Sequence, residues 1–375
     1  MHLVIVRPLG NVLDVNSYNC QEIGLAKALV NDGWCVSVIM AGLQNEHIRV
    51  NVSGEHFVDV YFLRFVGLQS VCLFRGWKRL IKKLKPDIIQ VHDLETWMSF
   101  RVVRYSYRHG IPCVLIQGAC PTEMSRNKRF FKKIFDSIFG KYVLKHVNAV
   151  GCKTPTASAY LNEIYPCETW TTPIGLDEQK FAGEVCRDWV AELHLEDKKV
   201  LLYVGRLNNY GRKPMFLVDL LRQLPSDYCL VMAGEGILRD DILCRASEYG
   251  ISDRVHLIGT ISQKHLPALY RAAHVFLLPS TYEIYGMVML EAMYFGVPVI
   301  STASAGAKVI IQQDVTGYIL DTFDTSLWAE KIVDINEKVQ KSMGADARQY
   351  IQKNLTWSGT AKKFEELYRL VTHRL

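Results

Sequence analysis

The sequence predicts an α/β protein made of two Rossmann-like domains, each with a doubly wound parallel sheet. In the first half, apolar runs typical of buried strands alternate with segments of helical spacing. The alternation starts again at Val200–Val204. A chain of 375 residues is also longer than one ordinary core accommodates, whereas two domains of half this length each fold well.

The first half begins with a strand, and an amphipathic helix follows it and ends near Gly33. A second helix lies between two later strands and ends at His109-Gly110. The predicted strands are Leu3–Val6, Cys35–Met40, Val58–Phe65, Ile88–Val91 and Cys113–Ile116, and the predicted helices include Gln21–Asn31 and the basic segment Trp77–Leu84.

The second half repeats the pattern up to a helix that runs from Gly286 to Gly296. No glycine-rich dinucleotide fingerprint follows the first strand of the chain, which disfavours a dehydrogenase. The predicted strands are Val200–Val204, Cys229–Ala233, Val255–Ile258, Val275–Pro279 and Pro298–Ile300, and the predicted helices include Met215–Leu224 and Arg239–Tyr249.

Composition is that of an ordinary globular protein, with 49% hydrophobic and 22% charged residues. No apolar run is long enough to span a membrane, and the start Met1–Arg7 is expected to be a strand and no signal peptide. Ten cysteines are scattered without paired short spacings. They favour reduced thiols in a cytoplasmic enzyme over a zinc site or a disulfide framework.

The excess positive charge lies in the first half. Residues 1–180 contain 22 Lys and Arg against 15 Asp and Glu, whereas residues 181–375 are close to neutral. No recognised nucleic-acid-binding motif accompanies this charge. We therefore expect an anionic membrane surface or a phosphate-bearing acceptor as the partner, and no nucleic acid.

The stretch Ser280–Ile300 carries the most specific chemical signal. Glu283 follows a buried strand in a loop, and Glu291 lies on the helix that Gly286 and Met287 open. Ligands of open α/β sheets bind beyond the carboxyl ends of the strands, where a helix N-terminus favours anions. A ligand with both phosphates and hydroxyls suits this setting.

Glu283 and Glu291, with seven residues between them, resemble the paired glutamates of retaining glycosyltransferases of family 4. The preceding Pro-Ser and the following Gly-Val-Pro-Val-Ile fit the resemblance. It implies a GT-B fold, in which two Rossmann-like domains face a central cleft. It also implies that Glu291 accepts hydrogen bonds from ribose hydroxyls, and that Glu283 lies beside the donor sugar and supports an oxocarbenium-like transition state.

The resemblance extends to the cations that follow the strand Val200–Val204. Arg206 and Lys213 match an Arg and a Lys that grip the donor diphosphate in the family, with Arg212 as the alternative to Lys213. These cations, together with the helix that begins near Gly286, would neutralise the leaving group. No Asp-x-Asp site is present, so we expect neither a metal nor a cofactor. Gly234-Glu235-Gly236 is expected to form a turn.

The same resemblance divides the chain into an acceptor-side domain, residues 1–177, and a nucleotide-sugar-binding domain, residues 178–355, with the closing helix 356–372 returning to the first domain. Asn16-Ser17 stand where the family often has Gly-Gly, and Gln117 stands where it often has His. Glutamine binds sugar hydroxyls but cannot act as a base. His92 is a further candidate for a polar role in the cleft, or a buried structural histidine.

Residues 126–143 have an apolar face and a basic remainder, which is typical of a helix at a membrane interface. The alternative is that the apolar stripe packs on the core of the domain. The membrane-facing candidates are Lys128, Arg129, Phe130, Phe131, Lys132 and Lys133.

These features predict a metal-independent, retaining hexosyltransferase of surface polysaccharide synthesis (lipopolysaccharide O-antigen, capsule or exopolysaccharide). The expected donor is a UDP-sugar, favoured over GDP-mannose, and the expected acceptor is a glycan or a lipid-linked saccharide. A location in the cytoplasm or at the inner face of the membrane follows from the same reasoning. The alternatives are a non-catalytic nucleotide-sugar-binding protein and another GT-B enzyme such as an epimerase.

Overall fold

The computed structural model describes residues 1–15, 20–118, 132–182 and 187–372. The chain forms two compact units: unit 1 comprises Met1–Gly175 and Trp357–Leu375, and unit 2 comprises Leu176–Thr356. The boundary expected after residue 177 therefore falls within the first residues of unit 2. Each unit has its own parallel sheet, so the prediction of two Rossmann-like α/β domains is confirmed.

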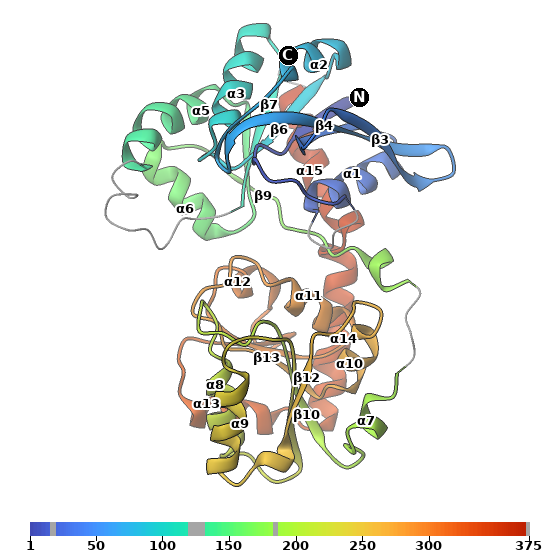
Figure 1. Ribbon diagram of the computed structural model, residues 1–375, viewed down its shortest axis with the longest axis vertical. Helices are drawn as coiled ribbons and strands as arrows, with labels where there is room; N and C mark the ends of the chain where they lie inside the picture. Colours follow the sequence, from blue (N-terminus) through green and yellow to red (C-terminus); the bar gives the residue numbers. More distant parts are fainter. Residues whose placement is uncertain (16–19, 119–131, 183–186, 373–375) are drawn as a thin grey trace. The chain divides into compact units, whose positions relative to one another are not determined.

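The sheet of unit 1 has the strand order β3-β4-β2-β1-β6-β7-β8-β9, and β5 also pairs with β4 (Figure 1). The pairs are parallel except β3–β4 and β4–β5. The strands are β1 (His2–Val6), β2 (Cys35–Gly42), β3 (Glu46–Ser53), β4 (His56–Leu68), β5 (Val71–Phe74), β6 (Ile88–His92), β7 (Cys113–Gln117), β8 (Ala149–Cys152) and β9 (Trp170–Thr171).

The hairpin β3–β4 is a feature that the sequence analysis does not predict, since it places one strand at Val58–Phe65. β3 is an edge strand in which apolar and polar residues alternate. Its Ile48, Val50 and Val52 are partly buried and pack against the core. Gly54 makes the turn with a φ of +56°. This period of two is the signal from which the strand could have been predicted.

Helices cover both faces of the sheet of unit 1. Along β1, Leu3 and Ile5 point into the core under α1 and α15, whereas Val4 and Val6 point into the core under the other helices. The helices are α1 (Gln21–Asn31), α2 (Trp77–Leu84), α3 (Trp97–His109), a π-helical segment (Asp136–Gly140), α5 (Lys141–His146), α6 (Pro155–Ile164) and α15 (Trp357–Thr372).

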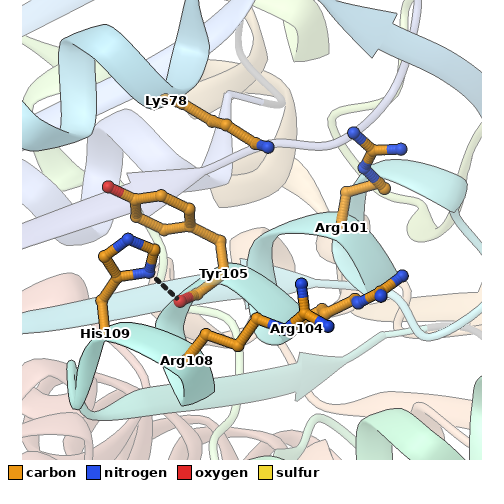
Figure 2. A pocket seen from close by; sticks show the side chains of 6 residues that line it. All are labelled: Lys78, Arg101, Arg104, Tyr105, Arg108 and His109. Atoms are coloured by element: carbon orange, nitrogen blue, oxygen red, sulfur yellow. Dashed lines mark hydrogen bonds between the residues drawn. The ribbon is translucent and has the colours of Figure 1, made fainter.

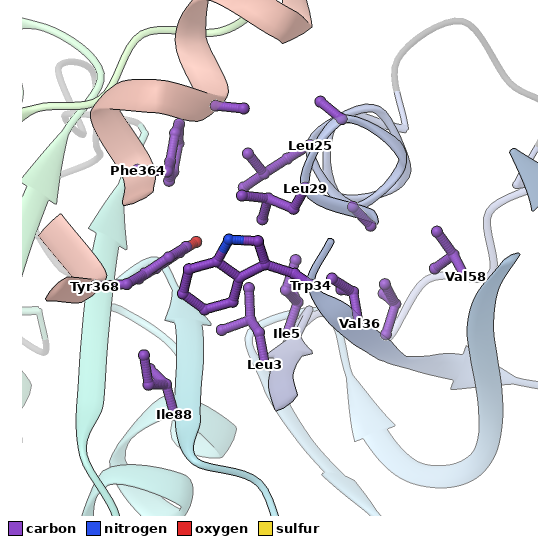
Figure 3. Packing of buried hydrophobic residues seen from close by; sticks show 14 of the residues in the cluster. Leu3, Ile5, Leu25, Leu29, Trp34, Val36, Val58, Ile88, Phe364 and Tyr368 are labelled. Carbon is purple, nitrogen blue, oxygen red and sulfur yellow. The ribbon is translucent and has the colours of Figure 1, made fainter. Parts of the chain in front are cut away.

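Helix α15 completes the first of these two cores, although it comes last in the sequence. Trp34 lies among Leu25, Leu29 and the α15 residues Phe364 and Tyr368 (Figure 3). The rings of Trp34 and Tyr368 meet edge to face at 5.4 Å. The Trp34 indole also donates a hydrogen bond of 2.9 Å to Glu365. The core of unit 1 is therefore incomplete without the end of the chain.

Unit 2 has six parallel strands in the order β12-β11-β10-β13-β14-β15. The order reverses between β10 and β13, which is where doubly wound sheets bind ligands beyond the strand ends. The strands are β10 (Lys199–Val204), β11 (Tyr228–Ala233), β12 (Val255–Gly259), β13 (Val275–Leu278), β14 (Val299–Thr302) and β15 (Gly317–Leu320). The helices are α7 (Trp189–Glu192), α8 (Pro214–Leu221), α9 (Arg239–Glu248), α10 (Leu266–Ala272), α11 (Met287–Tyr294), α12 (Ala307–Ile310), α13 (Thr325–Asp334) and α14 (Glu337–Asn354).

Candidate functional site

Two loops of unit 2 meet where its strand order reverses. The loop after β10 and the loop after β13 are joined by the backbone hydrogen bonds Lys213 N–H to Pro279 O (2.9 Å) and Tyr282 N–H to Gly211 O (3.2 Å). Gly211 has a φ of +69°, and a Cβ there would lie 3.0 Å from the Tyr282 carbonyl oxygen. The site residues on both loops are thereby held at one edge of the sheet.

Arg212 and Glu283 form an ion pair across these loops. Arg212 Nη2 lies 3.2 Å from Glu283 Oε2, and the two side chains are 25% and 15% exposed. Gly205 makes room for the guanidinium, since a Cβ on Gly205 would lie 2.4 Å from Arg212 Nη1. Lys213 is the cation predicted to act with Arg206, but Arg212 is the cation that contacts the glutamate.

Glu291 is placed by α11, one turn into the helix. Gly286 begins the helix with a φ of +83°, and a Cβ there would lie 2.5 Å from Met289 Cε and 3.1 Å from Glu283 Cγ. Glu291 is only 2% exposed, and the Tyr270 hydroxyl donates a hydrogen bond of 2.7 Å to its Oε2. The two glutamates thus differ in setting: one is a loop carboxylate paired with arginine, the other a buried carboxylate oriented by tyrosine.

Arg206 and Lys213 are exposed, and neither makes an ion pair with a described residue. The Lys213 ammonium lies 3.9 Å from the centre of the Phe323 ring, a cation–π contact. The carbonyl of Arg206 accepts a hydrogen bond of 2.8 Å from the Tyr203 hydroxyl, which fixes the backbone at the end of β10. Both cations therefore border the site without touching the glutamates.

Glycines let the surrounding loops pack backbone to backbone. A Cβ on Gly234 would lie 1.9 Å from the Gly205 carbonyl oxygen, and one on Gly236 would lie 2.1 Å from the Leu207 carbonyl oxygen. Gly306, which the sequence analysis does not single out, is as close to the Tyr285 carbonyl oxygen, at 1.9 Å. Its signal in the sequence is the small-residue run Ala303-Ser-Ala-Gly306 after a buried strand.

In unit 1, His92 belongs to a buried chain of polar groups. The Tyr368 hydroxyl donates to Gln90 Oε1 (2.5 Å), and Gln90 Nε2 donates to His92 Nε2 (2.8 Å). His92 Nε2 is therefore an acceptor, and the ring proton lies on Nδ1, 3.7 Å from Glu22 Oε1. Burial, followed by the charges of Lys153 and Arg7, lowers the pKa of His92 to about 3. Of the two interpretations of His92, the structure favours a buried structural histidine.

Gln117 is also buried, at the end of β7. Its Oε1 accepts a hydrogen bond of 2.9 Å from the Leu94 amide, and its Nε2 donates to both carboxylate oxygens of Glu95 at 3.1 and 3.2 Å. Burial and the neighbouring Asp93 raise the pKa of Glu95 to about 6. Asp93 and Glu95 are polar residues at a strand end that the sequence analysis does not choose, although their position after β6 was the available signal.

The basic segment before α5 is described only in part. Asn16, Ser17, Lys128, Arg129, Phe130 and Phe131 lie outside the described residues. Lys132 differs from its expected membrane-facing position, since its side chain is 14% exposed and its ammonium contacts Asp136 at 2.5 Å and the Tyr160 hydroxyl. Lys133 is exposed, whereas Phe139 packs on Trp97 and Phe100 in the core. The described aromatic part of this stripe therefore packs inward.

Two family profiles match this chain. "Glycosyltransferase Family 4" matches residues 23–180, and "Glycosyl transferases group 1" matches residues 187–353. Together they cover most of both units. The chain belongs to the GT-B glycosyltransferases of family 4. This glycosyltransferase is 26% identical over 377 residues to an uncharacterized glycosyltransferase of Methanocaldococcus jannaschii, and the match covers 92% of each chain.

Other relatives of the glycosyltransferase match over shorter regions. It is 33% identical over 181 residues to a D-inositol 3-phosphate glycosyltransferase of Salinispora tropica, which covers 45% of this chain and 38% of that protein. The aligned region thus covers well under half the length of that relative.

Solved structures share the fold of the whole glycosyltransferase. The sucrose-phosphate synthase of Thermosynechococcus elongatus matches with a TM-score of 0.74 and 22% identity over all of both chains. HepE of Anabaena, solved with UDP, matches with a TM-score of 0.73 and 16% identity over 98% of this chain and 100% of that one. The lipopolysaccharide outer core galactosyltransferase WaaB matches over all of both chains, with a TM-score of 0.66 and 13% identity. These neighbours show the GT-B fold.

Proposed function

We propose that this glycosyltransferase transfers a hexose, with retention of configuration, from a UDP-sugar to a glycan or lipid-linked acceptor in surface polysaccharide synthesis. The meeting of Arg212, Glu283 and the start of α11 at the strand-order reversal of unit 2 carries the proposal. Support for the donor comes from HepE, which is solved with UDP and with UDP-glucose. Support for a role in surface polysaccharide synthesis comes from WaaB, a lipopolysaccharide outer core galactosyltransferase that shares the fold.

Each glutamate has a role that suits its setting. Glu291, oriented by the Tyr270 hydroxyl, accepts hydrogen bonds from the ribose hydroxyls of the donor. Glu283, with its charge held by Arg212, holds a hydroxyl of the donor sugar and stabilises an oxocarbenium-like transition state. In a retaining reaction of this kind the acceptor attacks from the leaving-group face, and the departing phosphate helps to take its proton.

The diphosphate leaving group develops negative charge, which Arg206, Arg212, Lys213 and the first turn of α11 neutralise. No metal is needed in this scheme, and turnover in excess chelator tests that part of the proposal. On the acceptor side we assign a sugar-hydroxyl contact to Glu95, whose carboxylate the buried Gln117 amide holds at the strand ends of unit 1. An anionic membrane surface near Lys133 completes the proposed setting.

Calorimetric titration with UDP and GDP tests the assignment of Glu291. We expect Glu291→Gln to weaken UDP binding by about 1–3 kcal/mol, because a neutral amide accepts hydroxyl hydrogen bonds less well than a carboxylate. Glu330→Gln, in a side chain that is 62% exposed on α13 of the same unit, is the control and keeps wild-type affinity. Unchanged UDP affinity in Glu291→Gln contradicts the ribose role.

Turnover separates catalysis from simple binding. Glu283→Gln should keep UDP affinity within about threefold while the rate of sugar transfer falls by about a hundredfold or more. Arg212→Ala should lower the affinity for UDP but not for uridine, which lacks the diphosphate. Intact UDP binding without turnover of any UDP-sugar or GDP-sugar by the wild-type protein favours the non-catalytic alternative instead.

A further inference from the structure

A pocket on the solvent side of unit 1 gathers positive charge from two helices. It has a volume near 390 Å³ and lies between α2 and α3, where Lys78 extends from α2 toward α3 (Figure 2). The lining residues are Lys78, Arg101, Arg104, Tyr105, Arg108 and His109. The buried face of α3 is formed by other residues, Met98, Val102 and Val103 among them, so the pocket is separate from the strand-end residues Glu95 and Gln117.

The four permanently charged residues that line this pocket have no anionic partner among the residues that the structure describes. Within the described ranges, Lys78, Arg101, Arg104 and Arg108 form no ion pair, whereas Arg7 and Arg49 of the same unit contact Glu22 and Asp59. On α3 the three arginines recur at spacings of three and four residues, which brings like charges together on one helix face.

Helix dipoles explain only part of this arrangement. Arg108 lies in the last turn of α3, where a cation is favourable. Arg101 and Arg104 lie further from that end, and Lys78 lies in the first turn of α2, where a cation opposes the dipole. The convergence of these charges is therefore unfavourable for the fold by itself, and a bound anion would relieve it.

The aromatic side of the pocket is held in place by its own contacts. The rings of Tyr105 and His109 stack at 4.0 Å, and Trp77 meets Tyr105 edge to face at 5.4 Å. His109 Nδ1 lies 2.8 Å from the Tyr105 carbonyl oxygen, so Nδ1 carries the proton that this oxygen accepts. Because the Tyr105 and His109 rings are held in place, the pocket has a defined shape. A defined shape favours binding of one compact ligand over loosely associated counterions.

We propose that this pocket binds a ligand with a phosphomonoester or diphosphate group. Guanidinium groups bind phosphate oxygens through paired hydrogen bonds, and the Lys78 ammonium adds a point charge from the opposite helix. The volume accommodates a phosphorylated head group or a small soluble phosphate compound. The phosphate chemistry is common to both sources, and the site is independent of the donor function proposed for unit 2.

The test is calorimetric titration with inorganic pyrophosphate of protein that carries Arg212→Ala, which weakens diphosphate binding at the proposed donor site. No UDP is added, because its diphosphate would also compete for the pocket. The pocket variant is Arg104→Gln with Arg108→Gln. The control is Arg79→Gln with Lys83→Gln, which removes the same charge from exposed positions on α2 that do not line the pocket. We expect the pocket variant to lose pyrophosphate affinity about tenfold or more, and the control to stay within about twofold of the Arg212→Ala parent.

Vesicles distinguish the two sources. Co-sedimentation with vesicles of phosphatidic acid and phosphatidylcholine that is lost in the pocket variant, and blocked by pyrophosphate, identifies a lipid head group. Pyrophosphate binding without vesicle binding identifies a soluble ligand. Equal losses in the pocket and control variants, or wild-type protein that binds neither probe, overturns the proposal. Unchanged melting temperature and unchanged affinity for uridine, which lacks the diphosphate, separate any such failure from misfolding and from failure of the donor site.

Discussion

Tyr368→Phe isolates one buried hydrogen bond that links the last helix of the chain to His92. The side chains of Tyr368, Gln90 and His92 are buried. The tyrosine hydroxyl donates a hydrogen bond of 2.5 Å to Gln90 Oε1. Phenylalanine keeps the ring contact with Trp34 but leaves the Gln90 oxygen without this donor. The substitution therefore changes the polar chain and leaves the packing of the core nearly as it is.

A buried acceptor that loses its partner costs about 1–3 kcal/mol. With a central value of about 2 kcal/mol, exchange of the most protected amides of unit 1 should accelerate by about 30-fold. Hydrogen–deuterium exchange followed by mass spectrometry, read on peptides of β1 and β6, measures this in unit 1 alone. Tyr107→Phe, at a side chain that is 59% exposed, is the matched control and should exchange like wild type.

The reasoning is refuted if Tyr368→Phe leaves exchange in β1 and β6 within a factor of two of wild type. That result would mean that Gln90 finds another donor, and that the tautomer assigned to His92 does not depend on the tyrosine. An increase confined to α15 would point to local fraying of that helix, which also contradicts a polar chain that supports the centre of the sheet.

Three further outcomes follow from the same structure. Gly306→Ala should destabilise unit 2 by more than about 2 kcal/mol in urea denaturation, because its Cβ would overlap the Tyr285 carbonyl oxygen; a wild-type midpoint would contradict this. Folding raises the pKa of Glu95 from 4.5 to about 6, so its ionisation weakens the fold as pH rises through this range. Glu95→Gln should therefore add about 2 kcal/mol of stability at pH 7.5 and almost none at pH 4, and an equal gain at both pH values would refute the cause. Sugar transfer should persist in excess EDTA, and its loss, with recovery on adding magnesium or manganese, would show that a metal is required.

The sequence predicts the central strands well because their residues are buried on both faces. Apolar runs such as Leu3–Val6 and Val200–Val204 leave little choice of structure. The edge strand β3 carries a weaker signal, since it is half exposed and only Ile48, Val50 and Val52 provide its apolar side. The confirmed GT-B fold thus rests on core positions. The unpredicted strands are not confined to the edge, because the buried strand β8 is among them.

Site chemistry is less predictable, because side-chain partners depend on loops that meet in space. Spacing places Glu283 and Glu291 at a strand end, but it cannot tell whether Arg212 or Lys213 turns toward Glu283. Nor does it show that Lys132 contacts Asp136 inside the unit. A basic residue in an amphipathic pattern has the same appearance in the sequence whether its charge is paired or exposed.

The position of α15 has a consequence for how the protein is made. Unit 2 is continuous in sequence, whereas unit 1 waits for residues 357–372 before Trp34 and its neighbours are covered. Translation at roughly 5–20 residues per second takes about 10–40 s to pass from Gly175 to the end of α15. During that interval the nascent chain exposes an apolar seam along α1 and the sheet. Unit 2 can therefore complete its core first, and unit 1 can complete its core only after α15 has been made.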